Sequence, residues 1–313
     1  MSNEEQQISL FKLGSLVNLR ISAWSARKMM TPTDMSRMGI DIKDLPVEIV
    51  NLGRKMLVPI DAIKRISKIE QKARTFLARW SVQFGPASCF FVPITKLPDV
   101  EAQLSEMKKE FEQEVDDFIA NFDKMRSTME EKYADFWEKC LKAHYPASAQ
   151  LLRNKFGFGW HQFRINLPET SETNAQALAQ EMQESVSEFV KNYISSMREE
   201  VIKFCELMDA RVNGKVFRDE EEVKKLTGKS VSSFSNFVKR FQTMNIFGDT
   251  EIEKMLNEFK DQFLTDFDSE ETFDNDQIKA GVTQTLSSIR EKAMQITDQE
   301  SQFVDKLKRK IVI

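Results

Sequence analysis

The sequence predicts a mostly α-helical protein built on a long antiparallel helical hairpin, a coiled-coil-like stalk, with a few short β-strands and a C-terminal helical region. Only 10 Gly and 8 Pro residues occur among 313, too few for the many turns of a β-sandwich or a loop-rich enzyme. Two long runs without Gly or Pro, 99–144 and 174–212, also place apolar residues at helical spacing. Together these features favour long helices over a many-stranded sheet.

Changes of pattern along the chain predict three regions. Residues 1–97 are expected to form an N-terminal α+β head, and residues 98–212 the long hairpin, with a β connector at 156–168. Residues 213–313 are expected to form a region of shorter helices.

The first region mixes strand and helix patterns. Residues 16–24 alternate between apolar and polar side chains, which is typical of a half-buried strand. Thr31 or Asp34 is placed to cap a short helix. An amphipathic helix is expected from Pro59 to Trp80, and the apolar run at 88–95 indicates a second strand.

Each long run carries one narrow apolar stripe. The first runs from Leu104 to Cys140, ten steps over 36 residues, so its mean spacing is the 3.6 residues of a nearly straight helix. The second runs from Leu178 to Met208. Because exposure of either apolar stripe to water is unfavourable, we expect the two helices to pack with their stripes against each other. The stripe residues expected at helical interfaces are Phe111, Phe118, Phe122, Met125, Phe189, Tyr193 and Met197.

The connector between the long helices begins with a short helical piece near Leu151. Residues 156–168 then alternate and end at a proline, which predicts a strand or hairpin. Such a strand needs a partner for its edge, either its own hairpin arm or a neighbouring subunit. The connector residues expected at an interface are Phe158, Trp160 and Phe163.

The last hundred residues predict several short amphipathic helices. Acidic residues gather in this region, where 249–276 holds eleven acidic and two basic side chains. Such segregation of charge favours complementary contacts within or between subunits. The expected helices are 219–227, 230–245, 249–266, 275–297 and 300–310.

Composition argues against several classes of function. Cys89, Cys140 and Cys205 are too far apart for a zinc motif and are expected to be buried thiols in a reducing compartment. No local motif joins His144 or His161 to a nucleophile, so we expect neither catalysis nor a metal or other cofactor. The sequence has no signal-peptide pattern and no transmembrane run, which predicts a soluble cytoplasmic protein.

Nucleic-acid binding is the main alternative. Residues 54–79 hold eight basic and two acidic side chains, and an aromatic and basic patch covers 155–164. Cations hold phosphates and aromatic rings stack on bases, but a net charge of −4 argues against a general nucleic-acid coat. The contact residues of this alternative are Lys64, Arg65, Lys68, Lys72 and Arg164.

The N-terminal third also carries a family resemblance. The segment LVNLRISAWSARKMMT, followed by Leu52-Gly53-Arg54-Lys55 and the long charged helix, resembles a prokaryotic, phage- and plasmid-associated family known as domain of unknown function 3150. Genes of that family often stand beside genes for a MoxR-type AAA+ ATPase and a von Willebrand A-domain protein. The resemblance therefore implies a helical partner of an ATPase remodelling system, and it implies no catalytic residue.

Taken together, the long Phe- and Met-rich stripes favour a non-enzymatic assembly protein. We expect it to form a homo-oligomer through the stripes and the 156–168 connector. It would present a charged surface to a partner ATPase or to a larger phage-related structure.

Overall fold

A computed structural model describes residues 8–41, 51–85, 89–146, 148–165, 175–214, 228–263, 276–298 and 311–312. These residues form a mostly helical protein with a small antiparallel sheet. Among the described helices, none combines the length and the apolar character needed to cross a membrane.

The chain packs into two units, and each unit is assembled from separate stretches of sequence. Unit 1 comprises Met1–Val17, Trp80–Pro98 and Gln162–Ile313, and unit 2 comprises Asn18–Arg79 and Asp99–His161. These units do not coincide with the three consecutive regions expected from the sequence. The reason is that the strands β2 (Gly14–Ser22) and β7 (Gly157–Phe163) each have residues in both units, so the units cannot be separated by cutting the chain at one point.

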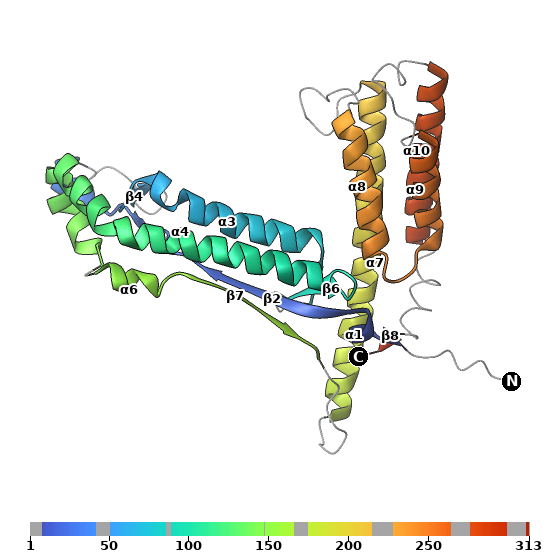
Figure 1. The fold of residues 1–313 in the computed structure, drawn as a ribbon, viewed down its shortest axis with the longest axis horizontal. Coiled ribbons are helices and arrows are strands. Elements are labelled where there is room, and N and C mark those ends of the chain that lie inside the picture. Colours follow the sequence, from blue (N-terminus) through green and yellow to red (C-terminus); the bar gives the residue numbers. More distant parts are fainter. Residues whose placement is uncertain are drawn as a thin grey trace. The chain divides into compact units, whose positions relative to one another are not determined.

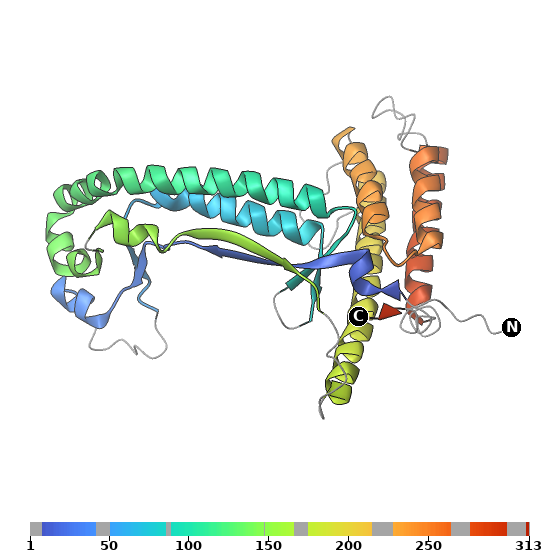
Figure 2. The same ribbon diagram turned by 60° about the horizontal axis from the view of Figure 1, so that its bottom comes forward.

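In unit 2, α3 and α4 run side by side along the strands β2 and β7 (Figures 1 and 2). Two ion pairs join the helices, Arg65–Glu114 at 3.5 Å and Lys72–Glu110 at 3.1 Å. The elements that lie wholly or partly in this unit are β2 (Gly14–Ser22), β3 (Arg27–Met29), α2 (Pro32–Arg37), β4 (Arg54–Met56), α3 (Ile60–Arg79), α4 (Leu97–Lys132), α5 (Ala134–Phe136), the π-helix η1 (Trp137–Leu141), the 3₁₀-helix η2 (Lys142–His144), α6 (Ala149–Arg153) and β7 (Gly157–Phe163).

Aromatic rings form the core of unit 2. Phe111 of α4 packs on Phe158 of β7 with ring centroids 5.6 Å apart, and Phe118 packs on Phe156 at 5.7 Å. Trp24 covers the next turn of α4 and lies 6.1 Å from Phe122. The apolar stripe of α4 is therefore covered by β7 and by the chain that follows β2.

The helix expected to run to His144 is interrupted at Tyr133. The backbone there leaves the helical region (φ −128°, ψ 41°), and the π-helix η1 follows. A π-turn adds a residue to the turn and rotates every later side chain around the axis. As a result Tyr133, predicted to lie on the stripe, is 43% exposed, whereas Trp137 is 1% exposed and belongs to the core.

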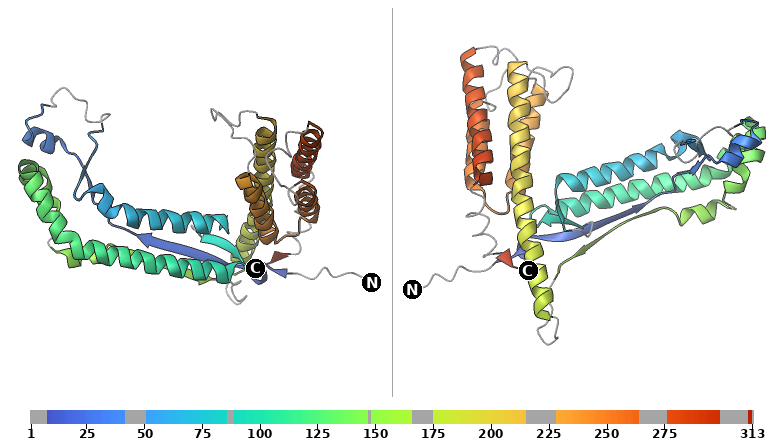
Figure 3. Two further views of the ribbon diagram at one scale, coloured as in Figure 1. Left: turned by 45° about the horizontal axis from the view of Figure 1, so that its top comes forward. Right: turned by 180° about the vertical axis from the view of Figure 1, so that it is seen from behind.

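In unit 1, the long helix α7 packs against α10 and α8 (Figure 3). Phe204 of α7 stacks on Phe237 of α8 at 3.8 Å, and Arg240 of α8 forms a bidentate ion pair with Glu200. The elements of this unit are β1 (Ile8–Ser9), α1 (Leu10–Leu13), β5 (Val82–Phe84), β6 (Cys89–Pro93), α7 (Ala175–Asn213), α8 (Gly228–Met244), α9 (Thr250–Phe263), α10 (Asp276–Asp298) and β8 (Ile311–Val312).

The main sheet has the strand order β5-β6-β2-β7, and its β2–β6 and β5–β6 pairs are antiparallel. Two short ribbons accompany it: β1 pairs with β8 in parallel, and β3 pairs with β4 antiparallel. Phe91 of β6 and Phe84 of β5 both pack on Phe189 of α7, with centroids 5.2 and 4.9 Å apart, so this end of the sheet covers α7.

Most predicted elements are confirmed with small shifts of their ends. The strands at 16–24 and 88–95, the helix from Pro59 and the second long helix all exist as β2, β6, α3 and α7. Thr31 caps α2 as expected. The helices expected at 219–227 and 300–310 lie outside the described residues.

The antiparallel hairpin of the two long helices is not confirmed. Within the described residues, the stripe of α4 packs on β7 and Trp24, whereas the stripe of α7 packs on α8, α10 and the β5–β6 strands. Each helix thus finds its apolar cover inside its own unit. The sequence showed correctly that both stripes must be buried, but it did not show by what.

Gly14 of β2 pairs with Pro93 of β6, at a point where the two strands lie close together. A Cβ atom at this position would lie 2.4 Å from the carbonyl oxygen of Val92 and 2.5 Å from the ring of Phe91. Such distances are shorter than any stable contact, so only glycine fits here.

We therefore expect Gly14→Ala to lower the free energy of unfolding by about 1–3 kcal/mol, because the strands must move apart to admit the methyl group. Urea unfolding followed by circular dichroism measures this change. Gly159→Ala in β7 is the matched control, since nothing lies within 4 Å of a Cβ there. Equal midpoints for the two variants would contradict the packing described for Gly14.

Candidate functional site

The ten apolar residues expected at interfaces fall into two groups, three that are partly or fully exposed and seven that are buried. Met125 and Trp160 are half-buried, and Phe163 is 37% exposed. The other seven are core residues of their own units and leave almost no surface for a partner. These seven are Phe111, Phe118, Phe122, Phe158, Phe189, Tyr193 and Met197.

The exposed end of the connector belongs to an edge strand. Among the strands that the structure describes, β7 is the last of the four-stranded sheet and pairs only with β2. The Ser15 hydroxyl donates a hydrogen bond to the Phe163 carbonyl (3.2 Å), which ties the end of β7 to β2. An edge strand offers backbone N–H and C=O groups to a further strand. The connector is thus one strand of a larger sheet, and Trp160 and Phe163 lie on that strand.

The four basic residues of α3 considered for nucleic-acid binding are all exposed. Three of them face carboxylates: Lys64 lies 3.6 Å from Asp61, and Arg65 and Lys72 pair with Glu114 and Glu110 of α4. Lys68 has no ion pair within the described residues. Arg164, also exposed, belongs to unit 1 and is not part of this row. Two of the basic side chains of α3, Arg65 and Lys72, are therefore paired with α4.

A buried ion pair joins α2 to β4 in unit 2. Lys55 Nζ lies 2.7 Å from both carboxylate oxygens of Asp34, and the side chains are 1% and 5% exposed. Thr31 and Asp34 also form a capping box, in which each side chain accepts a hydrogen bond from the other residue's backbone N–H. Asp34 consequently completes the N-terminal capping box of α2 and anchors this helix to β4 at the same time.

These contacts keep Asp34 ionised. Burial by itself would raise the pKa of this carboxyl, but hydrogen bonds from Lys55 and Thr31 and the charge of Lys55 outweigh it and lower the pKa to about 2. Cys140 Sγ contacts the Asp34 carbonyl at 3.8 Å, and burial followed by the nearby Asp34 charge raises the pKa of its thiol. A thiol held in its neutral form is a poor nucleophile, so this cluster is better suited to structure than to catalysis.

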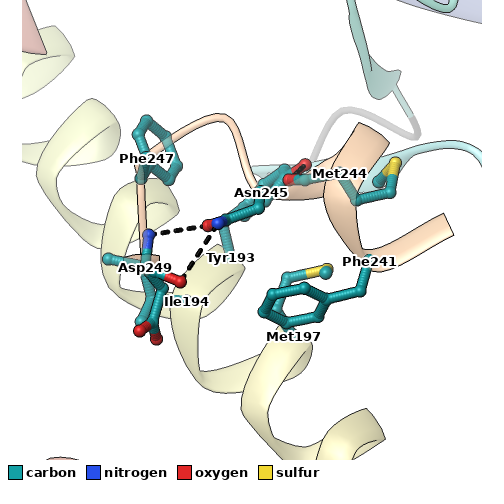
Figure 4. A pocket seen from close by; sticks show the side chains of 8 residues that line it. All are labelled: Tyr193, Ile194, Met197, Phe241, Met244, Asn245, Phe247 and Asp249. Carbon is teal, nitrogen blue, oxygen red and sulfur yellow. Dashed lines mark hydrogen bonds between the residues drawn. The ribbon is translucent and has the colours of Figure 1, made fainter. Parts of the chain in front are cut away.

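Unit 1 contains a hollow of about 270 Å³, part of it open to solvent, between α7 and the turn from α8 to α9 (Figure 4). Its walls are mainly apolar, and its polar groups are already paired. The Tyr193 hydroxyl donates to the Met244 carbonyl (2.7 Å), and burial raises the pKa of this hydroxyl far above its usual range. The lining residues are Tyr193, Ile194, Met197, Phe241, Met244, Asn245, Phe247 and Asp249.

Hydrogen bonds at the rim of this hollow hold the α8–α9 turn. Asn245 accepts from the Asp249 N–H (2.7 Å) and donates to the Asp249 carbonyl (3.1 Å). The Asp249 carboxylate accepts from Arg198 of α7 at 3.1 Å. The arrangement fastens the turn to α7, which accounts for each of these polar side chains without a ligand.

The buried Asp34–Lys55 pair and the partly buried Arg198–Asp249 pair were not predicted from the sequence. Asp34 and Lys55 are separated by 21 residues, and Arg198 and Asp249 by 51, so no local pattern joins either pair. The only visible signal was the Thr31-x-x-Asp34 spacing of a helix cap.

We expect Asp34→Asn to lower the free energy of unfolding by about 3–5 kcal/mol, because it leaves the Lys55 ammonium buried without a counter-charge. Denaturant unfolding at pH 7 measures this effect. The control is Asp135→Asn, which removes an exposed ion pair with Lys139 and should cost less than about 1 kcal/mol.

The same pair predicts a pH dependence. The folded pKa of Asp34 is depressed from 3.8 to about 2, so its contribution is complete above pH 3.8 and is lost as the pH falls toward 2. The loss amounts to about 2 kcal/mol in the wild type. If Asp34→Asn retained the full acid-dependent loss of the wild type, this assignment would be wrong.

Comparison with known proteins places the chain in a family. No curated protein and no solved structure matches it. A family model described as "Protein of unknown function (DUF3150)" matches residues 13–225, about two thirds of the chain. The resemblance drawn from the N-terminal segment is thereby confirmed, and the chain belongs to the DUF3150 family.

Proposed function

We propose that this protein is a non-enzymatic assembly protein that associates with further copies of itself. The observation that carries the proposal is the edge strand β7, whose outer edge has no partner strand within the described residues. Phe163, at its end, exposes 37% of its surface, and Trp160 is half-buried. Backbone groups and aromatic side chains on one strand suit strand-to-strand association.

The proposal includes the partners that the family resemblance implies. We propose that the assembled protein presents its charged helical surfaces to a MoxR-type AAA+ ATPase and a von Willebrand A-domain protein. The acidic face of α4 supports a charged contact, because Asp117 and Asp123 are exposed and form no ion pair within the described residues. The identity of these partners comes from the family resemblance alone.

Deletion of residues 156–168 is not a clean test of the connector, because Phe156 and Phe158 are core residues of unit 2. Charge on the exposed part of β7 is a better test. We expect the wild type to form multimers of its 36.4 kDa chain, and His161→Lys with Phe163→Lys to raise the dissociation constant at least tenfold. The added charges repel an incoming strand without entering the core.

Mass photometry over a range of concentrations measures this shift. Leu151→Lys is the matched control, because Leu151 is 56% exposed but lies on α6, away from the strand. A multimer that survives the β7 substitutions would remove this strand from the mechanism. A wild type that stays monomeric would end the proposal of self-association.

Nucleic-acid binding is retained as the second candidate because the basic residues of α3 form an exposed row. The pairing of Arg65 and Lys72 with α4 weakens it. We expect no binding of a fluorescein-labelled oligonucleotide at about 50 mM salt, where phosphate contacts are strongest. Binding that is lost when Lys64, Lys68 and Lys72 are all changed to Glu would instead support this second function.

A further inference from the structure

The two-stranded ribbon of β3 and β4 has two chemically different faces. Its register pairs Arg27 with Met56, Lys28 with Lys55, and Met29 with Arg54. Residues directly opposite in an antiparallel pair point to the same side, and so do alternate residues of a strand. Lys28 and Lys55 therefore share one face, and two arginines with two methionines share the other.

The lysine face is the one that meets the rest of unit 2. Lys55 is buried against Asp34 of α2, so α2 lies on that side of the ribbon at Lys55, while Lys28 beside it remains exposed. The opposite side, which we call the Arg/Met face, consists of Arg27, Met29, Arg54 and Met56 and points away from α2.

The Arg/Met face is accessible. Arg27 and Arg54 are exposed, Met29 is 50% exposed, and Met56 is half-buried. Neither guanidinium forms an ion pair within the described residues, in contrast to the basic residues of α3 that pair with α4. Two unpaired arginines and an exposed methionine thus lie together on a ribbon that an ion pair fixes in place.

This combination selects a particular chemistry in a partner. Guanidinium groups bind carboxylates with two parallel hydrogen bonds, and they stack on aromatic rings. Methionine side chains also make favourable contacts with aromatic rings. Arginine and methionine are both enriched at protein interfaces. An acidic segment that contains aromatic residues fits these preferences.

The chain itself contains such a segment at residues 264–275, between the end of α9 at Phe263 and the start of α10 at Asp276. Its sequence, LTDFDSEETFDN, holds five acidic residues, no basic residue and two phenylalanines, Phe267 and Phe273. The segment lies outside the described residues.

We infer that the Arg/Met face of the β3–β4 ribbon binds the acidic segment 264–275 of a second copy of this chain. The inference rests on the proposed self-association and names a second contact for it. Carboxylates of the segment pair with Arg27 and Arg54, and its phenylalanines cover Met29 and Met56. A head-to-tail contact of this kind joins unit 2 of one copy to the 264–275 segment of the next.

Charge reversal on both partners tests the contact. One variant carries Arg27→Glu and Arg54→Glu, and the other carries Asp266→Lys, Asp268→Lys and Asp274→Lys. We expect each variant alone to self-associate at least tenfold more weakly than the wild type, because like charges then meet. An equimolar mixture should recover mass, because each variant supplies the complement that the other lacks.

Two controls separate this contact from general effects. Lys28→Glu with Lys68→Glu reverses two exposed charges of unit 2 outside the Arg/Met face and should leave the mass distribution unchanged. Thermal unfolding of every variant should stay within a few degrees of the wild type, since the altered ribbon residues are exposed.

A peptide measurement keeps the two proposals distinguishable. The probe is a fluorescein-labelled peptide of residues 264–276, added to a chain whose 264–275 segment is replaced by Gly and Ser. We expect binding that Arg27→Glu with Arg54→Glu weakens at least tenfold. If the wild type is multimeric but neither the charge reversals nor the peptide show an effect, this inference fails and the proposed self-association stands.

Two other results would also overturn the inference. In the first, the equimolar mixture of the two charge-reversal variants stays dissociated, but one chain that carries both sets of substitutions behaves like the wild type. The acidic segment then binds the β3–β4 ribbon of its own chain. If an oligonucleotide binds through Arg27 and Arg54 while the peptide does not, the face is a nucleic-acid site.

Discussion

The need to cover two long, narrow apolar stripes governs this structure. The helices α4 and α7 are 36 and 39 residues long, and both would be unstable in water with their phenylalanine, methionine and valine residues exposed. Full burial of one such side chain contributes about 1.5–3 kcal/mol. Each helix obtains its cover within its own unit, α4 from β7 and Trp24, and α7 from α8, α10 and the β5–β6 strands. The chain forms two units because each long helix packs against a different set of elements.

Electrostatics has a different role from apolar burial in this protein. The exposed pairs between α3 and α4 contribute little to stability individually, but they join oppositely charged side chains of two helices that run side by side. The buried pair of Asp34 and Lys55 instead determines geometry. It holds α2 against one face of the β3–β4 ribbon and thereby decides which face remains outside.

The features left for recognition are consequently backbone edges and surface charge. The polar groups around the hollow of unit 1 are engaged with one another, and the Cys140 thiol is held neutral beside Asp34. By contrast, the edge of β7 has no partner strand within the described part of the chain, and three of the four residues of the Arg/Met face are exposed. These surfaces suit contacts with other protein chains, which is why the proposed function is assembly.

The sequence by itself determined the local elements. Spacing of apolar residues located α3, α4 and α7, alternation located β2, and a short apolar run located β6. Thr31 and Asp34 were the two candidate caps for a short helix, and Thr31 is the N-cap of α2. These elements depend on residues that are only a few positions apart, so they can be predicted from the amino-acid sequence. Only the tertiary structure decided which elements pack on each stripe. It also decided that the break in the helix at Tyr133 buries Trp137 in place of Tyr133, and that Asp34 pairs with Lys55. Many faces could cover a given apolar stripe equally well, and the choice among them depends on contacts between residues far apart in the chain.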